Sequence, residues 1–215
     1  MTYLNFYTTI LPFSGQPLGS QLLLHLFRDY RRPYDKIGEL VNQGILVQLK
    51  RGLYLPGPNL PLQKPEPFLT ANHLYGPSYV SFDAALSYWG LIPEKVVEIK
   101  SATLLHTKEF VTVSGVFVYV HVPSAYYALG LKSQQLAKGQ VAILASPEKA
   151  LMDKIIDTSG LQLRSMKQVE FFLMEDLRID EEDLRLLDTH SMQLWMKHAP
   201  KKQSMVSVLN FLNRL

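Results

Sequence analysis

Two adjacent cations, Lys50 and Arg51, stand between two short apolar runs in the stretch QGILVQLKRGLYLPG, residues 43 to 57. A cationic turn between two strands can contact the phosphates of a DNA duplex, because Lys and Arg side chains neutralise the backbone charge and release its counterions. Two cations at a turn are also commonly no more than a solvated loop. The residues around the turn decide which interpretation to favour.

Six cations lie between residues 28 and 54, against three acids; the cations are Arg28, Arg31, Arg32, Lys36, Lys50 and Arg51. They stand before a predicted helix and at the turn that follows it, where a helix-turn-helix unit meets phosphates. Asp35 and Glu39 fall on the outward side of the same helix and reduce its charge. Helix-plus-hairpin units also serve as protein–protein interaction modules, so both interpretations stay open on the residues alone.

A third chemistry is suggested by VVEIK, where Glu98 and Lys100 form the Glu-x-Lys half of a metal-dependent nuclease motif. On a strand the two side chains would point to the same side. An aspartate on a preceding strand should accompany them, but the nearest candidate, Asp83, falls in a predicted helix. The nuclease is therefore the least favoured alternative.

Other catalytic and metal-binding patterns are missing from the sequence. The six histidines form no HxxxH or HxH spacing, cysteine is absent, and neither a G-x-S-x-G elbow nor a P-loop occurs. We expect a non-enzymatic protein with no catalytic residues, no cofactor and no metal.

Composition indicates a folded protein with a sizeable core: the chain has 215 residues, 47% of them apolar and 19% charged, and a net charge of only +3. No window approaches the length of apolar sequence that a membrane span needs. The N-terminus lacks the features of a signal peptide. We therefore expect a cytoplasmic protein that does not contact a membrane.

The N-terminal pattern predicts helix, helix and two-stranded hairpin, the arrangement of a winged helix-turn-helix. Residues 3–11 could form a first short helix, and apolar residues recur at helical spacing from about Gly19 to Tyr30. Pro33 suits the first turn of the next helix, which ends near Gly44. We expect this helix to bury Tyr34, Ile37, Leu40 and Val41. The strand after it should bury Ile45, Val47 and Leu49 by alternation.

Prolines crowd the stretch PGPNLPLQKPEP and indicate a linker, because proline fixes φ and lacks a backbone donor. The predicted organisation is a winged-helix domain at 1–57, a proline-rich linker at 58–67 and a larger α+β domain at 68–215. In the last domain we expect strands at 96–105, at 110–122 with a turn at 114–115, and at 140–145.

The helices of the C-terminal domain are predicted from their start signals. Ser81 should cap a helix over 82–89, and Ser146 with Pro147 should start one that ends near Ile156. Ser165 and Gln168 have capping-box spacing, and Asp180 should cap a further helix. Helical segments at 65–75, 192–198 and 204–215 complete this α+β fold.

Three blocks in order, LKRGLYL, PSYVSFDAALSYWGLIPE and SPEKALMDKI, resemble the AbiEi family of antitoxins and transcriptional regulators from type IV toxin–antitoxin systems. The middle block is the most specific, and the resemblance covers nearly the whole chain. The C-terminal blocks consist mostly of apolar and capping residues, so they indicate a fold rather than a site.

The resemblance implies an N-terminal winged helix that binds inverted repeats of double-stranded DNA in its own promoter, as a homodimer on the site. It also implies a C-terminal domain that opposes a neighbouring nucleotidyltransferase-like toxin in phage defence, without a stable complex. The residues expected to contact DNA by this resemblance are Arg31, Arg32, Lys36, Gln43, Lys50 and Arg51.

Overall fold

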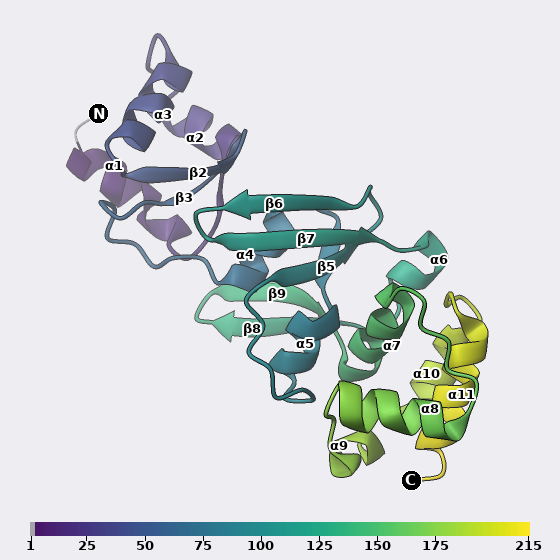
Figure 1. Cartoon of the computed structure of the whole chain (residues 1–215). Helices are drawn as coiled ribbons and strands as arrows, with labels where there is room; N and C mark the ends of the chain where they lie inside the picture. Colours follow the sequence, from purple (N-terminus) through teal and green to yellow (C-terminus); the bar gives the residue numbers. More distant parts are fainter. Residues whose placement is uncertain (1–2) are drawn as a thin grey trace. The chain divides into compact units, whose positions relative to one another are not determined.

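The computed structural model describes residues 3–215 and places them in two compact units (Figure 1). The first unit contains the chain up to Tyr75 together with the short segments Thr112–Ser114 and Gln135–Ala142. The second contains Gly76–Val111, Gly115–Gln134 and Ile143–Leu215. Helices and strands occur in both, so the fold class is α+β as the sequence predicts.

The first unit combines short helices with a small antiparallel sheet. In chain order its elements are α1 (Tyr3–Ile10), a 3-10 turn (Leu11–Phe13), β1 (Leu18–Gly19), α2 (Ser20–Leu26), α3 (Pro33–Asn42), β2 (Leu46–Lys50), β3 (Leu53–Pro56) and α4 (Pro67–Leu74). The three strands are ordered β1-β3-β2, so that β3 pairs with both of its neighbours. The predicted helix, helix and hairpin are therefore present as elements.

The core of the first unit is apolar and contains residues of α1, α2, α3 and the three strands. Phe6 from α1 stacks on Phe27 at a centroid distance of 5.5 Å. Ile37 and Leu40 are the buried residues of α3. Leu60 is only 3% exposed and belongs to the same cluster, although it lies in the segment that the sequence predicts as a linker.

Two packing predictions for this unit are wrong. Tyr34 is 67% exposed because it lies in the first turn of α3, at the border of the face that Ile37 and Leu40 bury. In the following strand, burial is confirmed for Ile45 and Leu49, but Val47 is only partly buried and Leu46 is fully buried instead. Further along the strand, the pairing with β3 shifts register between Gln48 and Lys50, as at a bulge.

The second sheet is mixed and six-stranded, in the order β6-β7-β5-β4-β9-β8. Its strands are β4 (Ser78–Val80), β5 (Ile99–Thr103), β6 (Lys108–Thr112), β7 (Gly115–His121), β8 (Leu131–Ala137) and β9 (Gln140–Ala145). β5 runs antiparallel to β4 and parallel to β7, and β4 runs parallel to β9. The predicted hairpin turn at Ser114–Gly115 separates β6 from β7.

The helices of the second unit gather mainly at the C-terminal end of the chain. They are α5 (Phe82–Tyr88), α6 (Ser124–Tyr127), α7 (Pro147–Asp157), α8 (Met166–Glu170) with a π-helical continuation (Phe171–Asp176), α9 (Glu181–Arg185), α10 (Thr189–Met196) and α11 (Lys202–Leu212). One continuous cluster of buried residues from these helices and from β4, β5 and β9 forms the core. No helix in the part of the chain that the structure describes is long and apolar enough to cross a membrane.

Predicted helix starts are confirmed where the capping side chain bonds a residue close to it in the sequence. The Ser146 hydroxyl accepts a hydrogen bond from the Lys149 amide at 3.3 Å, with Pro147 in the first helical position. Ser165 and Gln168 form the predicted capping box.

Other expectations fail. Asp180 precedes α9 without a side-chain capping bond, and Ser81 does not cap α5 either. The strand predicted from residue 96 begins only at Ile99. The strand β8 is mostly polar and lacks the apolar alternation from which a strand is predicted.

Candidate nucleic-acid interface and a buried polar cluster

The cations before α3 stay at the surface of the first unit. Arg31 and Arg32 are both exposed, and Pro33 begins the helix directly after them. The Arg32 guanidinium lies 3.6 Å from Asp35, with the two side chains 77% and 70% exposed. Water screens such a pair, which therefore stabilises the helix little. Arg32 lies one turn away from the acid whose charge it balances.

On α3 itself the charged residues are engaged with one another. The Lys36 ammonium is 2.7 Å from a carboxylate oxygen of Glu39, and the Gln43 amide donates to the other oxygen at 3.0 Å. These contacts, the hydrogen bond from Lys36 first, lower the pKa of the Glu39 carboxyl. Lys36 is also half-buried, 6.0 Å above the Tyr30 ring. The helix therefore neutralises its own acids.

The β2–β3 turn divides its two cations between different environments. Arg51 is exposed at the turn, while the Lys50 ammonium donates to the Leu74 carbonyl at 2.5 Å. Leu74 is the last residue of α4, and a cation there satisfies a carbonyl that has no partner within the helix. Lys50 thus ties the hairpin to α4. Of the six residues expected at DNA, Arg31, Arg32, Gln43 and Arg51 are exposed, although Arg32 and Gln43 also contact acids of α3. Lys36 and Lys50 are half-buried and make internal contacts.

Sequence reasoning missed a buried polar cluster in the second unit. Lys149 and Asp153 on α7 are both fully buried and their charged groups lie 2.7 Å apart. The other carboxylate oxygen of Asp153 accepts from the Tyr79 hydroxyl at 3.0 Å and from the Ser81 hydroxyl at 2.6 Å. Three donors therefore satisfy this buried carboxylate, as a charge in an apolar interior requires.

Aromatic rings complete the surroundings of the buried ammonium. The Lys149 ammonium lies 3.2 Å from the centroid of Tyr126 and 5.2 Å from that of Tyr79, within the range of cation–π attraction. Burial lowers the pKa of Lys149 to about 8, although Asp153 opposes that shift. Burial and the nearby Asp153 charge raise the pKa of both tyrosines well above the ordinary value. The cluster is closed to solvent, so it can hold the core together but cannot meet a substrate.

A sequence signal for this cluster does exist. Lys149 and Asp153 are one helical turn apart, the three residues between them are apolar, and Ile155 and Ile156 follow one position later, so α7 has apolar residues round most of its middle. A helix of that kind is buried, and ionisable residues in it must pair. Their partners on β4 and before α5 lie more than 70 positions earlier and could not be identified from the pattern of α7.

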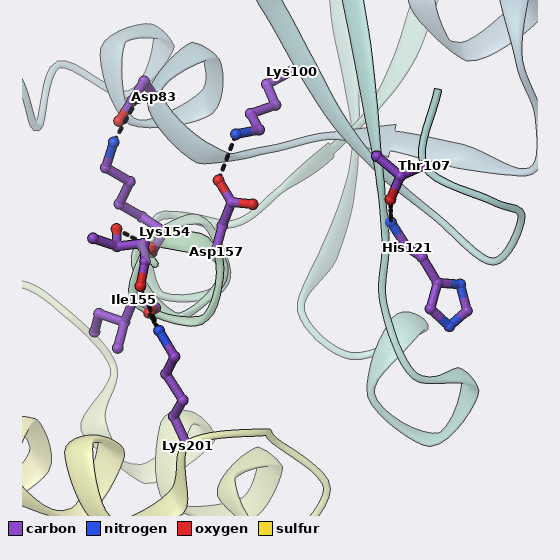
Figure 2. A network of polar contacts seen from close by, with 9 residues as sticks. Asp83, Lys100, Thr107, His121, Lys154, Ile155, Asp157 and Lys201 are labelled. Carbon is purple, nitrogen blue, oxygen red and sulfur yellow. Dashed lines mark hydrogen bonds and ion pairs between the residues drawn. The ribbon is translucent and has the colours of Figure 1, made fainter. Parts of the chain in front are cut away.

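A second set of polar contacts involves the partly exposed side of α7 (Figure 2). The Lys154 ammonium is 2.7 Å from Asp83, and the Lys100 ammonium is 2.5 Å from Asp157. At the end of α7, Lys201 donates to the carbonyls of Ile155 at 3.0 Å and Thr158 at 2.5 Å.

These contacts bear on the nuclease alternative. Lys100 binds Asp157, and Glu98 lies outside the strand and is exposed. No group of three or more His, Cys, Asp or Glu among residues 3–215 could hold a metal ion. Nothing in this geometry favours the nuclease.

No family model matches the chain, and no curated protein matches it.

Proposed function

We propose that the protein is a DNA-binding transcriptional regulator whose first unit is a winged helix. The observation that carries the proposal is the combination of element order and strand order in that unit. Helices α1, α2 and α3 are followed by the β2–β3 hairpin, and β1 closes the sheet in the order β1-β3-β2. Two helices followed by a hairpin support the winged-helix interpretation, in which α3 would be the helix that enters the major groove.

The distribution of exposed cations supports duplex DNA as the partner. Arg31 stands before α3 and Arg51 at the β2–β3 turn, so an exposed cation lies in the chain on either side of the proposed groove helix. Phosphate contacts of this kind position a protein without reading sequence.

We further propose that the protein acts as a non-enzymatic antitoxin of the AbiEi type in the cytoplasm. It would bind its promoter repeats as a homodimer and oppose a nucleotidyltransferase-like toxin without forming a stable complex with it. In support, the two C-terminal blocks of the resemblance meet in space, since Tyr79 and Ser81 of one contact Asp153 of the other.

Binding to the duplex upstream of the gene tests the DNA proposal, by fluorescence anisotropy over a series of salt concentrations. Wild type should bind with a steep salt dependence. Replacing Arg31 and Arg51 by Ala should weaken binding to all duplexes and reduce the slope of log K against log [salt] by about 1 for each phosphate that is no longer neutralised. Lys167→Ala removes an exposed cation from α8 and serves as the control. An unchanged slope in the double variant would remove these arginines from the interface.

A second candidate is a protein-interaction module with the same fold. The observation that favours it is the internal neutralisation of α3, where Lys36 and Gln43 bind Glu39 instead of remaining free. This candidate predicts no salt-dependent binding to any duplex, together with a stable complex with a protein partner.

A further inference from the structure

The exposed face of α3 contains a glycine that the fold does not require. Gly38 lies in the middle of the helix and is exposed, and a Cβ placed there would meet nothing within 4 Å. Its backbone is not among those with positive φ. A glycine inside a helix destabilises it relative to alanine, because more backbone entropy is lost on folding. Neither packing nor backbone geometry in this unit accounts for the residue.

Gly38 lies in a stripe that carries no charge. Tyr34 and Asn42, one turn before and one turn after it, are both exposed, and positions four apart share one face of a helix. The neighbouring acids Asp35 and Glu39 are balanced by Arg32 and Lys36. A partner approaching along this face meets an aromatic ring, bare backbone and an amide.

We propose that Tyr34, Gly38 and Asn42 form the base-reading surface of α3, an inference that rests on the proposed DNA binding. Without a Cβ at position 38, the helix backbone can approach the base edges more closely than any other residue would allow. The Asn42 amide has the donor and acceptor that pair with N7 and N6 of adenine, and the Tyr34 ring can pack on a thymine methyl group.

The same proposal gives Arg32 and Lys36 a different role from direct phosphate contact. By pairing with Asp35 and Glu39 they remove the negative charge that would repel DNA from this face. Duplex DNA is the partner that fits this face best, since its major groove admits a helix. Exposed Arg31 and Arg51, before and after α3 in the chain, provide cations for the DNA backbone.

The test is a selection of duplexes from a library with a randomised core, followed by affinity measurements on a selected and a scrambled duplex. Gly38→Ala should raise the melting temperature by about 2–4 °C, because alanine favours the helix. It should also weaken binding to the selected duplex at least tenfold, while binding to the scrambled duplex stays the same. Asn42→Ala should lose at least fivefold of the preference at one A·T pair.

Gln21→Ala, at an exposed position of α2, is the matched control and should change neither property. A stabilised Gly38→Ala variant that binds the selected duplex as tightly as wild type would overturn the inference while leaving the proposed function intact. A lower melting temperature for Gly38→Ala would also overturn it, because the glycine would then serve the fold. Wild type that binds no duplex at any salt concentration would remove the proposed function and this inference together.

Discussion

The buried pair Lys149 and Asp153 shows how much depends on single side chains inside the second unit. Two opposite charges out of water are tolerated only when each is paired and hydrogen-bonded. Here the ammonium has Asp153 and the Tyr126 ring, and the carboxylate has three donors. The arrangement leaves either charge uncompensated once the other is removed.

We therefore expect Asp153→Ala to lower the free energy of unfolding by about 3–5 kcal/mol, because it strands a buried ammonium. Urea denaturation followed by circular dichroism measures the decrease. The double variant Lys149→Met/Asp153→Leu removes both charges and should recover a large part of that stability. A double variant no more stable than Asp153→Ala would show that the cost comes from poorer packing and not from an unpaired charge.

The lowered pKa of Lys149 predicts a pH dependence of stability. Between about pH 8 and the ordinary lysine pKa of 10.5, the unfolded chain binds a proton that the folded protein releases. Stability therefore rises with pH in that window, by at most about 1.4 kcal/mol per pH unit. The tyrosines with raised pKa values oppose this trend only above about pH 10, where the unfolded chain loses its phenol protons.

The comparison that isolates the lysine is wild type against Lys149→Met. The difference in the free energy of unfolding, wild type minus variant, should increase from about pH 8 to about pH 10. A difference that stays constant across this range would mean that Lys149 keeps its proton in the folded state.

At the scale of elements, a hydrogen bond from Lys50 attaches the β2–β3 hairpin to the end of α4. The Lys50 ammonium binds the last carbonyl of α4, whereas Arg51 beside it is exposed. Lys50→Met keeps the aliphatic stem and should lower the free energy of unfolding by about 1 kcal/mol, since it removes one charged hydrogen bond at a partly exposed site.

Arg51→Met is the matched control for Lys50→Met and should leave stability unchanged. In DNA binding the opposite result is expected: Arg51→Met should reduce the slope of log K against log [salt], and Lys50→Met should leave that slope unchanged. Hydrogen exchange at the last turn of α4 provides a direct readout of the Lys50 contact. Equal exchange there in both variants would contradict it.

At the scale of the whole molecule, each of the two units has its own hydrophobic core. The core of the first unit includes Leu60, so the proline-rich segment contributes to this core. The second unit gathers α7 and the C-terminal helices with the inner strands of the six-stranded sheet. Each block that resembles the AbiEi family contributes residues to one of these cores, for example Tyr54, Phe82 and Leu151.

The sequence by itself determined those features whose cause is local. The capping box at Ser165, the start of α7 at Ser146–Pro147 and the hairpin turn before Gly115 follow from neighbours within three or four residues. Periodicity also located α2 and α3, because their apolar spacing is itself the cause of their packing.

Tertiary structure alone decided which partner a polar residue takes. Ser81 has the type and position of a helix cap, yet its hydroxyl binds Asp153, 72 positions later. Lys50 and Arg51 are equivalent in the sequence, yet only one of them meets a helix end. Such choices depend on which groups folding brings within hydrogen-bonding distance, and a local pattern contains no information about that distance.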